Sequence, residues 1–224
     1  MARSFDGTDD EISFGTDPSV DNIFQAAPNT GTLAFWLKRG ATGFMYLLNK
    51  FTDATDAGWQ SSFRAAGGGH TLRFDHDWTT ANGSWETTSA FTDTAVFTHF
   101  AVTYNGGGTG NDPVFYVNGV VDTTVELATP SGTIVADGAI NLMAGESDDD
   151  IGDFNGLLGW VSFDNTIWTA AQVNRAKWWG RPGGPMLVYH PLVTEKLTNE
   201  GTATANGTAT GATMASLPRV QRNY

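Results

Sequence analysis

Hydrophobic residues alternate with polar or small residues along many short stretches of this chain. The clearest case is "FTHFAVTYNGGGTGNDPVFYVNGVV", residues 97–121, in which every second residue is large and apolar over 100–104. A period of two positions is typical of β-strands, because successive side chains of a strand point to opposite faces. Asn118-Gly119 follows the second apolar run, and these residue types tolerate the positive φ angles of a type I′ turn. The pattern therefore predicts a three-stranded meander.

Similar runs continue along most of the chain and are separated by Gly, Asn, Asp and Pro. These separations suit an antiparallel sandwich far better than alternating strands and helices. We therefore predict an all-β, two-sheet antiparallel jelly-roll sandwich. The expected strands are Ser4-Phe5, Ile12–Phe14, Thr32–Lys38, Phe44–Asn49, Trp59–Arg64, Thr71–Phe74, Phe97–Tyr104, Val114–Val117, Val120–Leu127, Ala139–Ala144 and Gly156–Phe163.

One short helix is expected near residues 169–177. Thr169 and Gln172 have the spacing of a capping box, in which each side chain binds a backbone N–H near the other residue. Trp168 and Val173 flank this box in the positions of a hydrophobic staple. The Gly- and Pro-rich residues from 180 onward then end the helix.

The polar C-terminal part of the chain has two interpretations. Residues 194–213 are nearly of low complexity, which favours a flexible extension. Thr alternates with Ala near residues 208–213, which favours an edge strand instead. We divide the chain into a jelly-roll domain, 1–192, and a polar C-terminal extension, 193–224, that combines an edge strand with a tail.

Composition agrees with a turn-rich β-protein. The 224 residues include 27 Gly, 12% aromatic residues and only 16% charged residues, and this length suffices for a single core. The chain has no cysteine, so disulfides do not stabilise it. A net charge of −12 would repel phosphate groups, which argues against nucleic acids and anionic membranes as partners. The first ten residues, "MARSFDGTDD", lack the apolar segment of a signal peptide, and no long apolar stretch follows, so we expect neither secretion by this route nor a membrane span.

Five segments carry a family resemblance: "RSFDGTDDEISF", "GTLAFWLKR", "HFAVTYNG", "VFYVNGV" and "FNGLLGWVSFDNTIWTAAQV". Together they resemble successive motifs of the laminin G-like, concanavalin A-like lectin-glucanase jelly-roll superfamily, over most of residues 3–179. The resemblance implies two packed sheets, with Phe35 and Leu37 facing one side of their strand and Trp36 the other. It leaves function open, because the fold hosts lectins, glycosidases, adhesion modules and structural proteins.

The ending "NGTATGATMASLPRV" is similar to laminin G-like proteins encoded by tailed bacteriophages. This resemblance implies a virion protein, displayed on the capsid or tail in several copies and bound to capsid or tail proteins. It also suggests that the C-terminal strand lies beside the N-terminal one. Arg219 and Arg222 are then candidates for docking on an acidic neighbour. The alternative is a carbohydrate-binding adhesin module that attaches to host or environmental glycans, with or without calcium.

Glycoside hydrolysis is disfavoured by the carboxylates present. Laminarinase-like members of the superfamily use a Glu-x-Asp-x-x-Glu motif, in which nucleophile and acid stand on one face of a sheet. The nearest approach here begins at Glu146, and its sixth position is Ile151. We therefore expect no enzymatic activity and assign no catalytic residue.

Two acidic clusters are candidates for calcium, whose preferred ligands are hard carboxylate oxygens. The first, in "ESDDDIGDFNG", contains Glu146, Asp148, Asp149, Asp150 and Asp153. The second contains Asp6, Asp9 and Asp10 in the "FDGTDD" turn. The alternative for the first cluster is a solvated loop, which is the more common role of an acidic run. The alternative for the second cluster is a turn role, because Asp6-Gly7 is a hairpin turn signal.

Three tryptophans are candidates for stacking on sugars. Trp59, Trp78 and Trp85 lie close to polar residues, and the last two belong to the segment "FDHDWTTANGSWETT". The alternative is that they cover a sheet edge. The other tryptophans flank the last long strand and the helix and are expected in or near the core: Trp160, Trp168, Trp178 and Trp179.

Overall fold

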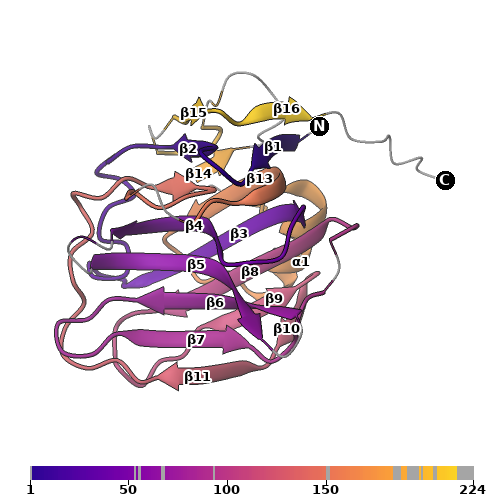
Figure 1. The fold of residues 1–224 in the computed structure, drawn as a ribbon. Helices are drawn as coiled ribbons and strands as arrows, with labels where there is room; N and C mark the ends of the chain where they lie inside the picture. Colours follow the sequence, from indigo (N-terminus) through magenta and orange to yellow (C-terminus); the bar gives the residue numbers. More distant parts are fainter. Residues whose placement is uncertain are drawn as a thin grey trace.

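The protein is a sandwich of two antiparallel sheets in a computed structural model (Figure 1). The structure describes residues 2–52, 54, 57–66, 69–92, 94–149, 152–183, 188–190, 197, 199–203 and 206–215. Sheet 1 contains, in spatial order, β10 (Val120–Asp122), β9 (Val114–Val117), β8 (Thr98–Asn105), β3 (Thr30–Arg39), β13 (Asn155–Asp164), β1 (Ala2–Asp6) and β16 (Thr213–Ala215), and β14 (Val188–His190) also pairs with β13. Sheet 2 contains β11 (Thr124–Ala128), β7 (Gly83–Thr87), β6 (Gly69–His76), β5 (Ala57–Ala66), β4 (Met45–Thr52), β12 (Met143–Ala144), β2 (Glu11–Ser13) and β15 (Thr208–Thr210). The predicted fold class is confirmed.

The predicted meander is present as β8, β9 and β10. Its second turn has φ of 53° at Asn118 and 81° at Gly119, as the sequence signal requires. The expected single strand over 120–127 is instead two strands. After β10 the chain leaves sheet 1 and enters sheet 2 as β11, so that each of the two forms an edge of its own sheet.

Aromatic side chains fill the space between the sheets. Trp59 on sheet 2 contacts Phe163 on sheet 1, with ring centroids 5.0 Å apart. Trp85 on sheet 2 contacts Tyr104 on sheet 1 at 5.3 Å. These rings are almost completely buried, and each removes a large apolar area from water, so this layer is the main source of the sandwich's stability.

The predicted helix is present as α1 (Ala170–Trp179), on the outer face of sheet 1. Thr169 and Gln172 form the expected capping box, and Gly180 ends the helix with a φ of 72°. A second buried cluster lies beneath α1 and comprises Ala34, Ala101, Tyr116, Trp160, Trp168, Val173 and Ala176. As expected, Phe35 and Leu37 face the main core, whereas Trp36 faces the helix and donates from Nε1 to the Lys177 carbonyl at 2.8 Å.

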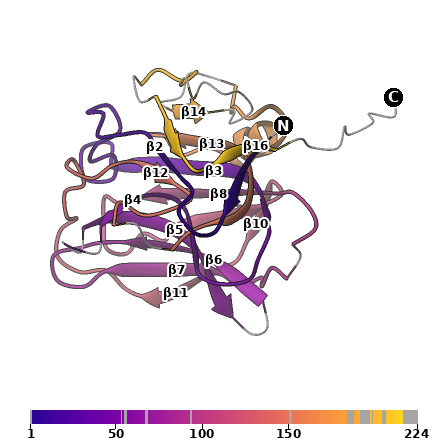
Figure 2. The ribbon, with the colours of Figure 1, turned by 45° about the horizontal axis from the view of Figure 1, so that its top comes forward.

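The two ends of the described chain pair with each other. β16 lies antiparallel to β1, with Ala215 opposite Ala2, and β15 lies antiparallel to β2 (Figure 2). This pairing agrees with the expected C-terminal strand beside the N-terminal one. The boundary at residue 192 between domain and extension stays a prediction. In the described part of the chain, α1 is too short and too polar to cross a membrane.

A buried histidine beneath α1 makes stability depend on pH. His99 is completely buried between Trp36 and Trp160, and neither ring nitrogen has a hydrogen-bond partner among the described residues. Burial lowers the pKa of His99 to about 3, and that of His76 likewise to about 3. Because these pKa values lie below the unfolded value, the folded state is fully favoured above pH about 6.5 and loses stability as the pH falls.

We predict that His99→Phe flattens this pH dependence. The histidine costs about 1.4 kcal/mol of unfolding free energy per pH unit below about 6.5, and phenylalanine removes that cost while keeping a ring in place. Urea unfolding of both proteins at pH 7.5, 6 and 5 measures the difference. Burial raises the pKa of Asp137 to about 6, which acts in the opposite direction in both proteins, so the difference between the two slopes is the informative quantity. Equal slopes would contradict the prediction.

Candidate functional site

All three candidate tryptophans are core residues, so the predicted exposed platform is wrong. Trp59 and Trp85 have no exposed surface. Trp85 lies on β7, a strand that we did not expect because its sequence is polar and resembles a loop. The indole N–H of Trp85 donates to Asp112 at 2.8 Å, which satisfies its only polar group inside the protein.

Trp78 alone of the three borders an open cavity. It follows β6, forms an isolated bridge with Ile134 and is 6% exposed. A cleft of about 490 Å³ lies against it. The cleft is lined by Gln25, Asn29, Trp78, Gly106, Gly107, Gly108, Thr109, Gly132, Thr133 and Ile134.

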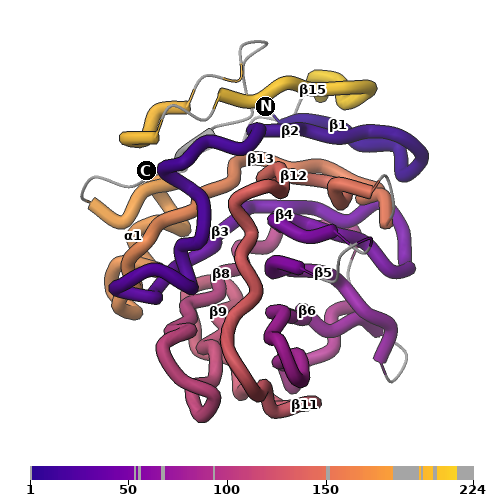
Figure 3. The backbone as a smooth tube through the Cα atoms, turned by 90° about the vertical axis from the view of Figure 1, so that its left-hand side faces the viewer, coloured from indigo at the N-terminus to yellow at the C-terminus, as the bar shows by residue number. Residues whose placement is uncertain are grey.

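Four connections between strands build this cleft at one end of the sandwich: β2–β3, β6–β7, β8–β9 and β11–β12. Figure 1 draws β6 and β7 joined at this left-hand end, and Figure 3 views it directly. The β2–β3 connection is tied to the β8–β9 connection by a bond from Gly106 N to the Asn29 carbonyl at 2.7 Å. It is tied to the β11–β12 connection by a bond from Gln25 Nε2 to the Ile134 carbonyl at 3.0 Å. The walls are therefore fixed to one another.

The chemistry of the cleft is polar and uncharged. Its lining offers two carboxamides, two hydroxyls, one indole and the backbone of four glycines, with no ionisable side chain. Such a surface can donate and accept hydrogen bonds at close range without demanding a charge on the ligand. It suits a neutral ligand that carries several hydroxyl groups.

The first acidic cluster does not form a single ion site among its described members. The described part of the chain contains one group of three or more carboxylates whose oxygens lie within 4.8 Å of each other, and it is not this one. Asp148 accepts from the Asn141 carboxamide, and Asp149 accepts from the Thr52 hydroxyl at 2.8 Å, so these carboxylates fasten loops. Glu146 is 4% exposed, and Asp150 lies outside the described residues.

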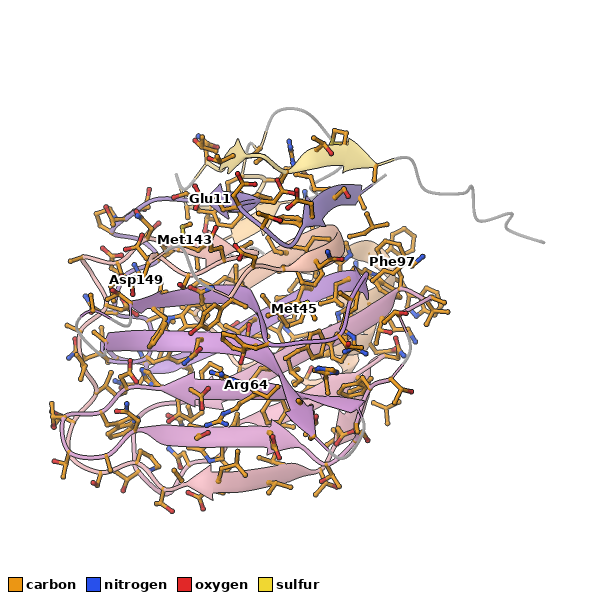
Figure 4. All side chains as sticks on the ribbon, in the orientation of Figure 1. Glu11, Met45, Arg64, Phe97, Met143 and Asp149 are labelled. Carbon is orange, nitrogen blue, oxygen red and sulfur yellow. The ribbon has the colours of Figure 1, made fainter. Side chains whose placement is uncertain are left out.

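The second acidic cluster does come together. Asp6, Asp9 and Asp10 each present an oxygen within 4.8 Å of the others, in the turn between β1 and β2. Asp10 is 6% exposed and accepts from the Asp6 N–H at 2.6 Å. Burial raises the pKa of Asp10, and the neighbouring charges of Asp6, Asp9 and Asp153 raise it further. Asp153 of the first cluster therefore lies near Asp10, whereas Figure 4 shows Asp149 apart from Glu11, the residue that follows the second cluster.

Two tryptophans that we expected in or near the core are exposed instead. Trp178 and Trp179, at the end of α1, are 68% and 71% exposed. The helix buries Val173 and Ala176 against sheet 1, and this face leaves both indoles in solvent. The sequence could have indicated this exposure, because a helix buries only one stripe of residues against a sheet and two adjacent residues do not both lie on one narrow stripe. Trp160 and Trp168 are buried as expected. Arg219 and Arg222, the docking candidates, lie outside the described residues.

The chain belongs to the concanavalin A-like lectin/glucanases superfamily, whose laminin G model matches residues 6–174. Similar folds include a native heptameric SAP-like pentraxin from Limulus polyphemus, at 17% identity and a TM-score of 0.60, covering 93% of each chain. A protein assigned to carbohydrate binding from Bacteroides ovatus has 16% identity and a TM-score of 0.63, covering 97% of this chain and 60% of that one. The CBM40 of the Ruminococcus gnavus IT-sialidase bound to α2,3-sialyllactose has 13% identity and a TM-score of 0.52, covering 73% and 91%. No curated protein matches the sequence.

We predict that calcium, if it binds, acts through the turn between β1 and β2. Three carboxylates at close range supply hard oxygens, and a cation would relieve their mutual repulsion. Calcium at ten times its dissociation constant should then raise the free energy of unfolding by about 1.4 kcal/mol. Melting curves with and without calcium measure this gain.

Two matched variants assign the ion. Asp9→Asn should abolish the calcium-dependent gain, whereas Asp149→Asn should retain it, because Asp149 belongs to the other cluster. Loss of the gain in Asp149→Asn alone would place the ion on the 146–153 loop.

Proposed function

We propose that this protein is a carbohydrate-binding module whose cleft beside Trp78 holds a neutral sugar. The observation that carries the proposal is the lining of this cleft, which combines an indole, amides, hydroxyls and glycine backbone with no charge. The hydroxyl groups of a sugar are matched by the amides, hydroxyls and glycine backbone of the lining, and Trp78, which is 6% exposed, contributes a small apolar strip of the wall.

The size and rigidity of the cleft support the same assignment. Its volume of about 490 Å³ falls in the range of small-ligand pockets, which is ample for one or two sugar rings. Hydrogen bonds between three of the four connections hold the walls before any ligand arrives. Preformed walls reduce the entropy lost on binding.

The solved relatives add support at the level of the fold. The Bacteroides protein is assigned to carbohydrate binding and the Ruminococcus module holds sialyllactose, so similar sandwiches accept sugars. The proposal is one of binding without bond cleavage, because the sequence offers no second glutamate near Glu146 for a catalytic pair.

Display on a bacteriophage capsid or tail, in several copies, stays a prediction from the sequence resemblance. A sugar-binding module on such a particle would attach it to host or environmental glycans, so the two roles are compatible. Mass spectrometry of purified particles would identify the chain and its neighbours, and its absence from the particles would end the virion hypothesis.

We predict that Gly108→Trp abolishes neutral-sugar binding. Gly108 lines the cleft, and a Cβ added there meets no atom closer than 3.6 Å, so a large side chain fits the fold but fills the cavity. Gly110→Trp is the control, because Gly110 lies on the same connection outside the lining and a Cβ there meets nothing within 4 Å. A glycan array of neutral oligosaccharides finds the ligand, and calorimetry measures its affinity for each variant. Equal affinities of the two variants would contradict the proposed site.

A further inference from the structure

The end of α1 is a local basic surface on an acidic protein. The whole chain carries a net charge of −12, yet residues 165–194 contain no Asp or Glu and include Arg175, Lys177 and Arg181. Trp178 and Trp179 stand in solvent among these cations. Exposed tryptophan is costly in contact with water, and a positive surface on a negative protein attracts anions.

A hollow of about 380 Å³ lies on one side of this surface. It is lined by Arg175, Trp179, Arg181 and Gly183. Gly183 has a φ of 104°, a conformation that favours glycine, and its backbone lies close to the Arg175 guanidinium. The hollow therefore lies at the turn that follows α1, whereas the cleft beside Trp78 lies at the β6–β7 connection, and Figure 1 shows α1 apart from that connection.

The two arginines of the hollow are in different electrostatic states. Arg181 forms an ion pair with Glu200, which holds its guanidinium in the wall. Arg175 is exposed, and within the described residues its guanidinium takes part in no hydrogen bond or ion pair. The Arg175 guanidinium is therefore available to a ligand in the hollow that Trp179 also lines.

We propose that this hollow binds a sugar residue that carries a carboxylate, as a second site separate from the neutral cleft. The guanidinium of Arg175 matches a carboxylate in a two-pronged geometry. The indole of Trp179 covers the apolar face of the sugar ring. The volume of the hollow is that of a single sugar, so the site binds one acidic sugar residue and not an extended oligosaccharide.

This inference rests on the proposed function in one respect, namely that the ligand is a sugar. The hollow itself is a different site from the cleft beside Trp78. Uronic and sialic acids share the required chemistry, and the experiment separates them. Calorimetry is carried out with 3′-sialyllactose, a glucuronic acid disaccharide and lactose as the neutral counterpart. At least one acidic sugar should bind at low salt, with an affinity that falls as salt rises, and it should bind more tightly than lactose.

Surface variants locate the binding. Arg175→Gln and Trp179→Ala should each lower the affinity for the acidic sugar by about tenfold or more. Trp178→Ala is the matched control, because this indole is equally exposed but does not line the hollow, and its affinity should stay unchanged. Both tryptophans are exposed, so melting temperatures of all variants should stay close to that of the parent.

The outcomes separate the two proposals. Acidic-sugar binding that persists in Gly108→Trp and is lost in Arg175→Gln supports the hollow, even if neutral sugars never bind. Binding lost in Gly108→Trp but kept in Arg175→Gln would assign the acidic sugar to the cleft and overturn the inference. The absence of any acidic-sugar binding, or Arg175-dependent binding to phosphatidylserine vesicles alone, would also overturn it.

Discussion

The layer of aromatic rings between the two sheets is the constraint on which the rest of the structure depends. Phe24 enters this layer from the β2–β3 connection and contacts Trp59 with ring centroids 5.8 Å apart. Gln25 follows directly, so burial of one phenylalanine places a cleft residue on the rim. Gly106 approaches the same point, where a Cβ would stand 2.8 Å from the Phe24 carbonyl. The core therefore sets the position of the cleft. Its walls are loops, and the buried rings keep these loops in place relative to one another.

A buried ion pair on sheet 2 also holds the β2–β3 and β11–β12 connections. The Lys50 side chain is fully buried, and its ammonium donates to Asp21 at 2.7 Å and to the Ile140 carbonyl at 2.6 Å. An unpaired charge at this depth would cost several kcal/mol, so the segments that carry these two acceptors are held against sheet 2. Loops at this end are therefore fastened both by rings and by an ion pair.

The outer face of sheet 1 has a different organisation. The helix buries a narrow stripe that includes Val173 and Ala176, and this suffices to cover the second apolar cluster. The remaining helix surface is free to carry Arg175 and the two exposed indoles without any cost to the packing beneath. One face of this short helix therefore packs on the sheet, and the other is the face that we propose for recognition. The neutral cleft and the basic hollow lie on different parts of the sandwich and differ in charge, so we expect them to select different ligands.

The sequence by itself determined those features that depend on neighbouring residues. The alternation over 100–104, the turn at Asn118-Gly119 and the capping box at Thr169 each involve residues a few positions apart, and all three are present. Only the tertiary structure decided which aromatic residues are buried. Trp85 is buried because its ring packs against Tyr104 of the opposite sheet, whereas Trp179 is exposed because sheet 1 covers another face of α1. These outcomes depend on contacts between residues far apart in the chain, and a local hydrophobic pattern does not specify those contacts.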